Sequence, residues 1–193
     1  GIHPIYEFLS NEFTKQLRSE IQNATAATGT IWNPNAGQHI EENVKKRKEM
    51  VGMPSESDLF IRGKLIQLMP QIAEEFGVEL EDVQPLKFTR YDTGDYYRYH
   101  TDNSHNPDAP AGINDRKVSV IIFVNQEGED LEEGDYCGGN LTFYGLLDDP
   151  QWRGIGLPLE SEAGLLIAFR PDILHEVTPV TEGCRLTITT WFV

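Results

Sequence analysis

The spacing of apolar residues changes once along this chain, near Val83, and the change limits the folds that the chain can adopt. Before Val83, apolar residues recur at helical spacing over Tyr6–Ala27 and Ser57–Phe76. After it, short runs are alternating or continuously apolar, as β-strands are. The expected strands are Gln84–Arg90, Tyr96–His100, Lys117–Asn125, Gly139–Tyr144, Ala163–Phe169, Glu176–Val180 and Arg185–Val193. Two helices followed by many short strands predict an α+β protein, a jelly roll or other closed β-sandwich with helices packed on one side.

Both helical segments carry local signals for where they begin or end. Ser10 is a suitable N-cap for the first helix, and Gly77 is a suitable stop for the second. Pro70 lies inside the second segment and is expected to kink or split it, because proline removes a backbone donor. The apolar stripe of each helix predicts a face packed against a sheet and no chemistry.

The segment 28–55 separates the two helices and has no clear periodicity. It contains turn residues such as Gly29 and Gly37, and then a charge run over Glu41–Glu49. Such a run is typical of a solvated loop or helix surface. The alternative is a mobile lid in which Trp32 or the cationic cluster meets a substrate. The sequence leaves both interpretations open.

Length and charge limit the domain count and the partners. A chain of 193 residues with 39% hydrophobic and 24% charged residues predicts one domain over 1–193, with a helical and loop part over 1–82 and the β core over 83–193. The formal net charge of −15 disfavours binding to nucleic acid, which usually requires a basic face. The sequence does not indicate an oligomeric state.

The cysteines and the N-terminal residues predict a cytoplasmic protein. Cys137 and Cys184 are too few for a secreted disulfide framework and lack the spacing of a CxxC motif, so we expect reduced thiols. No apolar run is long enough to span a bilayer, and the first residues show no signal-peptide pattern. We therefore expect no membrane partner.

A candidate metal site begins with the pair His100 and Asp102. On a strand, side chains two residues apart point to the same face, so the imidazole and the carboxylate converge. His175, just before another β-type run, is the best-placed third ligand. Two histidines and one carboxylate on one face of an octahedral site are typical of non-haem Fe(II). His105, just past the first pair, is the alternative to either histidine.

Arg185 opens the last expected strand, ten residues beyond His175. Alternation places Arg185 on one face with Thr187, Thr189 and Trp191. A guanidinium on such a face is suited to holding a carboxylate in a bidentate fork.

From roughly residue 84 to the end, these features resemble the Fe(II)- and 2-oxoglutarate-dependent dioxygenases, in their prolyl-4-hydroxylase-like branch. The matching residues, in family order, are Arg90-Tyr91 before a glycine turn, Tyr97, His100, Asp102, Phe123-Val-Asn125, Gly138-Gly139-x-Leu141, His175-Glu-Val, Arg185 and Thr190-Trp191-Phe192. The paired glycines by themselves indicate only a tight bend or bulge. The resemblance implies a double-stranded β-helix with the metal in its open mouth.

The resemblance also implies roles for individual residues. His100, Asp102 and His175 would hold Fe(II), and Arg185 with Tyr91 would bind the distal carboxylate of 2-oxoglutarate. Arg116 and Trp191 match substrate-binding positions, as Tyr97 does less closely. O2 would be the second co-substrate, and Asp102 favours hydroxylation because related halogenases lack this carboxylate.

The implied reaction is hydroxylation of an unactivated C–H bond in a small molecule, a peptide or a protein. The branch suggests a prolyl residue, and a free amino acid or metabolite is the alternative. Asn140 and Phe123 depart from residues found in some relatives. We expect specificity to arise in two long connections, His105–Arg116 and Gly145–Glu160.

Two other interpretations remain open. One is a cupin-like protein that binds metal or a small ligand without turnover, although such a site has no need of Arg185 as a carboxylate clamp. The other is a metal-dependent hydrolase with Glu176 as its base. On a strand, however, Glu176 should face away from its neighbour His175.

Overall fold

The computed structural model describes residues 1–33, 37–104, 106–146, 149, 151 and 154–193, with the backbone alone at residues 32, 33 and 37–39. The helices are α1 (Asn11–Asn23) and α2 (Ser55–Phe76). The strands of the N-terminal part are β1 (Ile2–Ile5), β2 (Thr25–Thr28), β3 (Ile31–Asn33), β4 (Gly37–His39), β5 (Lys45–Lys46) and β6 (Lys48–Val51). Those that follow are β7 (Lys87–Asp92), β8 (Tyr96–His100), β9 (Val118–Phe123), β10 (Cys137–Gly138), β11 (Leu141–Phe143), β12 (Leu157–Leu159), β13 (Leu166–Phe169), β14 (His175–Val177), β15 (Val180–Glu182) and β16 (Cys184–Phe192).

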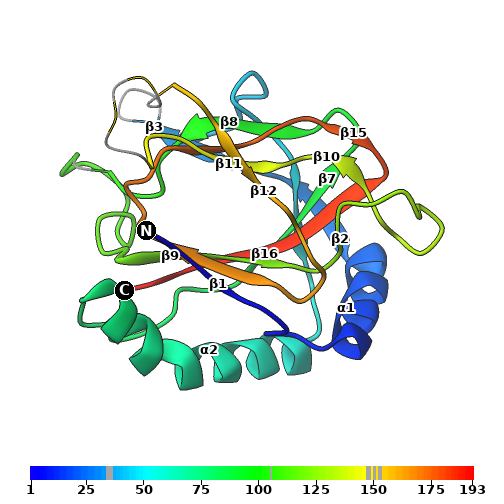
Figure 1. Cartoon of the computed structure of the whole chain (residues 1–193), viewed down its shortest axis with the longest axis horizontal. Coiled ribbons are helices and arrows are strands. Elements are labelled where there is room, and N and C mark those ends of the chain that lie inside the picture. Colours follow the sequence, from blue (N-terminus) through cyan, green and yellow to red (C-terminus); the bar gives the residue numbers. More distant parts are fainter. Residues whose placement is uncertain (34–36, 105, 147–148, 150, 152–153) are drawn as a thin grey trace.

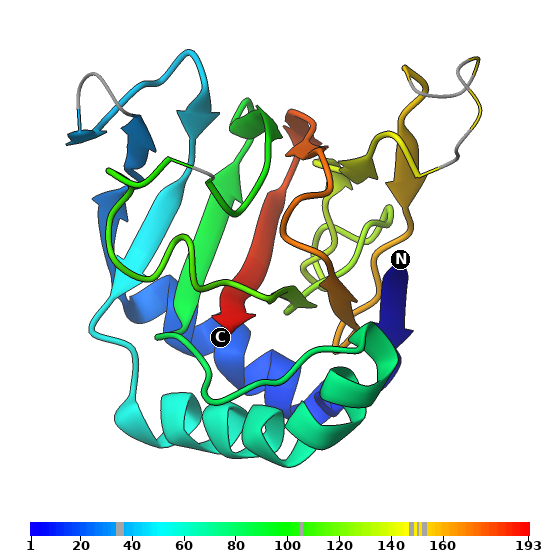
Figure 2. The same cartoon turned by 90° about the vertical axis from the view of Figure 1, so that its left-hand side faces the viewer.

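Two antiparallel sheets face each other, and both helices lie under the larger one (Figure 1). The seven-stranded sheet has the order β1-β13-β9-β16-β7-β6-β2, and the five-stranded sheet has the order β12-β11-β14-β8-β5. This is the predicted jelly roll, the double-stranded β-helix, with helices on one side. Figure 2 shows both helices crossing beneath the strands of the larger sheet.

The core is divided between the two faces of the larger sheet. One cluster fills the space between that sheet and the helices, and includes Leu17, Ile61, Leu65, Ile122 and Ile188. A second cluster lies between the two sheets and includes Tyr91, Phe143 and Phe169. The predicted stripes of α1 and α2 are thus confirmed as packing faces. Neither helix within the described residues has the combination of length and apolar character needed to cross a bilayer.

The helix boundaries differ from prediction at one helix and agree at the other. Ser10 caps α1 by accepting the N–H of Phe13, as expected, but the helix is shorter than Tyr6–Ala27, because β1 precedes it and β2 follows directly. In α2, Gly77 adopts a left-handed conformation and ends the helix. Of the two expectations for Pro70, a kink or a split, the split was wrong: α2 continues through Pro70, whose side chain is exposed to solvent.

The prediction of a solvated loop or a mobile lid over 28–55 was wrong for its second half. There β5 pairs with β8 of the smaller sheet, and β6 pairs with β7 of the larger one. This segment therefore joins the two sheets along one edge. Lys45 and Arg47 are buried, at 3% and 8% exposure, while Lys46 between them is exposed. The side chain of Trp32 lies outside the described residues.

Candidate active site

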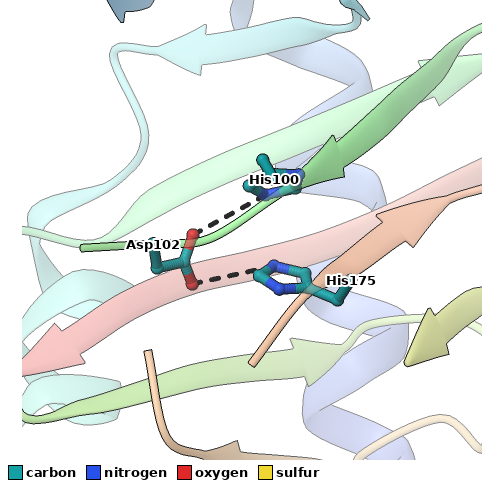
Figure 3. A group of neighbouring side chains, drawn as sticks. All are labelled: His100, Asp102 and His175. Carbon is teal, nitrogen blue, oxygen red and sulfur yellow. Dashed lines mark ion pairs between the residues drawn. The ribbon is translucent and has the colours of Figure 1, made fainter. Parts of the chain in front are cut away.

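The three predicted metal ligands meet between the two sheets, although they come from separate parts of the chain. His100 ends β8 and lies directly across from His175, which begins β14. Asp102 follows β8, and its N–H donates to the carbonyl of Pro171. The Nε2 atoms of His100 and His175 lie 3.6 Å and 3.8 Å from the two carboxylate oxygens of Asp102 (Figure 3). One candidate ligand atom from each residue lies within 4.8 Å of the others, which suits a single ion.

Backbone carbonyls orient both imidazoles toward this common point. The Nδ1 atoms of His100 and His175 each lie 2.8 Å from the carbonyl oxygen two residues earlier, Arg98 and Ile173 respectively. A carbonyl accepts only, so Nδ1 carries the proton and Nε2 presents its lone pair to a metal. Burial, and then the neighbouring His175, hold the pKa of His100 well below its usual value, so its imidazole is neutral near pH 7.

Asp102 is the acidic member of the site. Burial alone would raise the pKa of Asp102, but the neighbouring imidazoles of His175 and His100 lower it to about 2. The carboxylate is therefore ionised at neutral pH. The neutral imidazole of His100 and the ionised carboxylate of Asp102 are in the protonation states that binding of a divalent metal requires.

Arg185 enters the same cavity from β16 and is 1% exposed. Its Nη1 donates to Thr187 Oγ1 at 3.3 Å, while its Nε and Nη2 have no hydrogen-bond partner. The rings of Tyr91 and Phe123 each lie 5.2 Å from the guanidinium carbon. Among the described residues, no carboxylate forms a salt bridge with Arg185. A buried cation with free donors fits a ligand carboxylate.

Tyr91 lies beside Arg185 with its hydroxyl already partly engaged. Tyr91 Oη accepts the Nη1–H of Arg47 at 2.9 Å, which leaves the hydroxyl proton free to donate. Tyr91 and Arg185 face each other on paired strands. Their positions suit two donors to one carboxylate.

The three predicted substrate contacts also line the cavity, which has a volume of about 510 Å³. The ring of Tyr97 stacks on His100 with centroids 3.5 Å apart. The guanidinium of Arg116 lies over Trp191 at 3.6 Å and donates to the backbone carbonyl of Asp102 at 2.6 Å. Pro110 and Ile113 of the connection before Arg116 line the same cavity.

Three cationic residues of the cavity, Lys45, Arg47 and Lys87, were not predicted individually as site residues. Lys45 and Arg47 were considered only as part of a cationic cluster in a possible mobile lid. Lys87 was detectable, because it alternates with Thr89 and Tyr91 along β7 and so shares their inward face. Lys45 and Arg47 carried no such signal, since all residues from Lys45 to Glu49 are charged.

The competing ligands lie elsewhere or outside the described residues. His3 contacts Glu75 at 3.5 Å, far along the chain from the site. His105 and the side chain of His39 lie outside the described residues, as do Pro150 and Trp152 of the second long connection. Glu176 accepts the hydroxyl of Tyr144 at 2.5 Å and is not part of the cavity wall, as strand alternation predicts.

The first of the paired glycines lies at a bulge, and the second lies close to the Arg185 stem. The register of β10 against β15 shifts between Cys137 and Gly138. Gly139 has φ +62°, and a Cβ atom there would lie 2.8 Å from Val180 Cγ2 and 3.0 Å from Arg185 Cδ. Only glycine fits this position without moving the Arg185 stem.

We expect Gly139→Ala to lower the free energy of unfolding by at least about 2 kcal/mol, because it adds both backbone strain and a clash. Urea denaturation measures this. Gly63→Ala is the control, since Gly63 lies within α2 and a Cβ atom there meets nothing within 4 Å. An equal loss in both variants would contradict the structural role of Gly139.

Comparison with known proteins agrees with this geometry. The sequence model of the 2OG-Fe(II) oxygenase superfamily matches residues 86–193, more than half of the chain. A PKHD-type hydroxylase of Nitrobacter winogradskyi is 36% identical over 110 residues, which are 56% of this chain and 43% of that protein. A PKHD-type hydroxylase of Synechococcus sp. is 30% identical over 190 residues, which are 96% of this chain and 74% of that protein.

Solved structures share the fold over the whole chain. A prolyl-4-hydroxylase of Pseudomonas putida superposes with a TM-score of 0.69 at 25% identity, covering 100% of this chain and 91% of that one. A prolyl hydroxylase of Trichoplax adhaerens superposes with a TM-score of 0.75 at 18% identity, covering 100% and 83%. The chain therefore belongs to the 2OG-Fe(II) oxygenase superfamily, in its prolyl-4-hydroxylase-like branch, and is an iron(II)- and 2-oxoglutarate-dependent dioxygenase.

Proposed function

We propose that His100, Asp102 and His175 are the iron ligands of this dioxygenase. The observation that carries the proposal is the meeting of these three side chains, with ligand atoms within 4.8 Å of one another, on the wall of a cavity that also holds Arg185. Both Nε2 lone pairs are directed by the Nδ1 contacts of the imidazoles. Iron(II) bound there supplies, with 2-oxoglutarate and O2, the oxidation of an unactivated C–H bond.

Arg185 and Tyr91 bind the distal carboxylate of 2-oxoglutarate in this proposal. The support is the pair of unpartnered N–H groups on Arg185 and the free proton of the Tyr91 hydroxyl. Both side chains are buried, so the charge-assisted hydrogen bonds form away from water and fix the co-substrate in one orientation.

The protein itself performs no proton transfer in this scheme. Its residues hold the ligands in place, orient the co-substrate and exclude water. Tyr97 contributes by stacking on His100, which holds that imidazole in position, in addition to its predicted contact with substrate. Arg116 contributes by donating to the Asp102 carbonyl.

For the substrate, we propose a prolyl residue of a peptide or protein, or a free amino acid, which meets Arg116 and Trp191. The Pseudomonas putida relative is a prolyl-4-hydroxylase, and the Trichoplax adhaerens prolyl hydroxylase was solved with a peptide fragment of hypoxia-inducible factor. Both residues stand on the cavity wall beside the proposed iron ligands. The connections on either side of the site are proposed to select among substrates.

Anaerobic reconstitution with Fe(II) and 2-oxoglutarate tests the proposed site. We expect a weak visible charge-transfer band, because the keto acid chelates the metal in this arrangement. The band should need both components, and succinate in place of 2-oxoglutarate should not produce it. A folded protein that binds neither iron nor 2-oxoglutarate would contradict the assignment.

A further inference from the structure

The cavity is strongly cationic, in contrast to the chain as a whole, whose formal net charge is −15. Among the described residues of its wall, the charged side chains are Lys45, Arg47, Lys87, Arg116, Arg185 and the single carboxylate Asp102. Such a concentration of one charge in a partly buried site favours a ligand of the opposite charge.

Protein carboxylates leave most of this charge uncompensated. Glu49 forms salt bridges with both Lys45 and Arg47, at 3.2 Å and 3.3 Å. Among the described residues, Lys87 and Arg116 have no such partner. Five basic side chains face the two carboxylates of Asp102 and Glu49, and burial lowers the pKa of Lys45 to about 7, so that lysine is only partly charged at neutral pH. The surplus is therefore between two and three positive charges.

Iron and the co-substrate do not remove this surplus. Fe(II) carries two positive charges and 2-oxoglutarate two negative charges, so their joint binding leaves the sum unchanged. Arg185 is used by the co-substrate in the proposed function, while Lys87 and Arg116 are not. Lys87 and Arg116 both line the cavity and both lie beside Trp191.

Lys87 and Arg116 flank one aromatic ring. Lys87 Nζ lies 5.5 Å from the Trp191 ring centroid, and the Arg116 guanidinium lies 3.6 Å from it. Burial lowers the pKa of Lys87, and the cations Arg47 and Arg116 lower it further. The cations therefore repel one another, and an anion among them would relieve the repulsion.

The unpartnered polar atoms point to the same kind of ligand. Within the described residues, the buried side-chain atoms without a partner are Arg47 Nε, Ser119 Oγ, Arg185 Nε, Arg185 Nη2 and Trp191 Nε1. Four of these five are N–H donors that cannot accept a hydrogen bond. Trp191 is 5% exposed and lines the cavity, and its buried indole N–H has no acceptor among the described residues.

We propose that the substrate carries a carboxylate, which binds at Trp191 between Lys87 and Arg116 and accepts the indole N–H. The inference rests on the proposed function, because it assigns Arg185 to 2-oxoglutarate. The carboxylate belongs either to a free amino acid or to a peptide, as its C-terminus or an acidic side chain. In this proposal, Lys87 determines substrate specificity. The enzyme then prefers substrates with a carboxylate over neutral analogues of the same shape.

Paired probes test this selectivity by binding, without turnover. The protein is loaded anaerobically with Fe(II) and saturating 2-oxoglutarate, and the visible band confirms the loading. The standard amino acids and their amides are then titrated by calorimetry, as are Ala-Pro-Glu and Ala-Pro-Gln peptides with free and amidated C-termini. We expect at least one acid to bind at least about tenfold more tightly than its neutral partner, because hydrogen bonds to a charged group form with the acid alone.

Lys87→Gln should remove most of this preference and leave the affinity for 2-oxoglutarate within about twofold. Lys15→Gln is the matched control, since Lys15 is an exposed lysine of α1 and its loss changes the net charge equally. Preference within the amino-acid series or within the peptide series identifies the source of the carboxylate.

Several outcomes overturn the inference. One is a loaded site with no preference for acids in either series, including no binding at all. Another is a preference that survives in Lys87→Gln. A loss of 2-oxoglutarate binding in Lys87→Gln would assign Lys87 to the co-substrate instead. Absence of the visible band in the unmodified protein is a separate result, which contradicts the proposed iron and co-substrate site.

Discussion

Asp102→Ala should abolish turnover and lower the affinity for iron by more than about 100-fold. Partners that only orient a metal ligand already contribute roughly 10- to 100-fold to affinity, and Asp102 would be a ligand itself. It is also the one carboxylate of the three-residue cluster. Equilibrium dialysis with Fe(II) under anaerobic conditions measures the affinity, and succinate release measures turnover.

Asp108→Ala is the control for this variant. Asp108 is an exposed aspartate a few residues along the chain, so the same charge is lost without touching the cluster. Circular dichroism shows whether both variants are folded. A folded Asp102→Ala protein that binds iron as tightly as Asp108→Ala does would remove the carboxylate from the metal site.

The parts of this site that the sequence predicts are those set by strand alternation. A period of two residues places Arg185 with Thr187 and Trp191 along β16. Asp102 was predicted to join His100 by the same rule, but it lies two residues beyond the end of β8, where its N–H donates to the carbonyl of Pro171. The cavity wall contains all five. Local sequence patterns do not show which strands lie next to one another. For this chain, that expectation came from the resemblance to the dioxygenase family.

The N-terminal part was predicted less well, because its strands are defined by distant partners. β1 pairs with β13, and β6 pairs with β2 and β7, so the partners of both strands are separated from them along the chain by other elements. β1 also contains Pro4, which is compatible with its place at the sheet edge. The helix stripes, by contrast, follow from spacing alone, and α1 and α2 occur where apolar residues recur at that spacing.

The charge run shows why composition misled. Lys45 and Arg47 are buried, and they alternate with the more exposed Lys46 and Lys48. This stretch passes from β5 in the smaller sheet to β6 in the larger sheet. A sequence in which every residue is polar shows no alternation, even when half of its side chains face inward. Burial, and then the neighbouring Arg47, lower the pKa of Lys45 to about 7, which a solvated lysine would not show.

Arg185→Ala is expected to weaken 2-oxoglutarate binding by about 100-fold or more, while iron binding stays nearly intact. Truncating one partner of a buried, hydrogen-bonded charge pair typically costs about 2–5 kcal/mol, and each 1.4 kcal/mol is about tenfold in affinity. Among the described residues, the Arg185 guanidinium forms no hydrogen bond with the three metal ligands and donates only to Thr187. The visible band should therefore still form, but only at much higher 2-oxoglutarate concentration.

Two further variants separate the roles of charge and geometry. Arg185→Lys keeps the positive charge but loses the planar fork. Its affinity for 2-oxoglutarate should therefore fall between that of the unmodified protein and that of Arg185→Ala. Arg90→Ala is the control, because Arg90 lies opposite Leu186 on the neighbouring strand, bonds Asp92 and does not line the cavity. If Arg185→Ala lost iron and 2-oxoglutarate to the same extent, Arg185 would support the fold of the site. Loss of 2-oxoglutarate alone assigns it to the co-substrate, because a residue that only packs the core has no reason to discriminate between the two ligands.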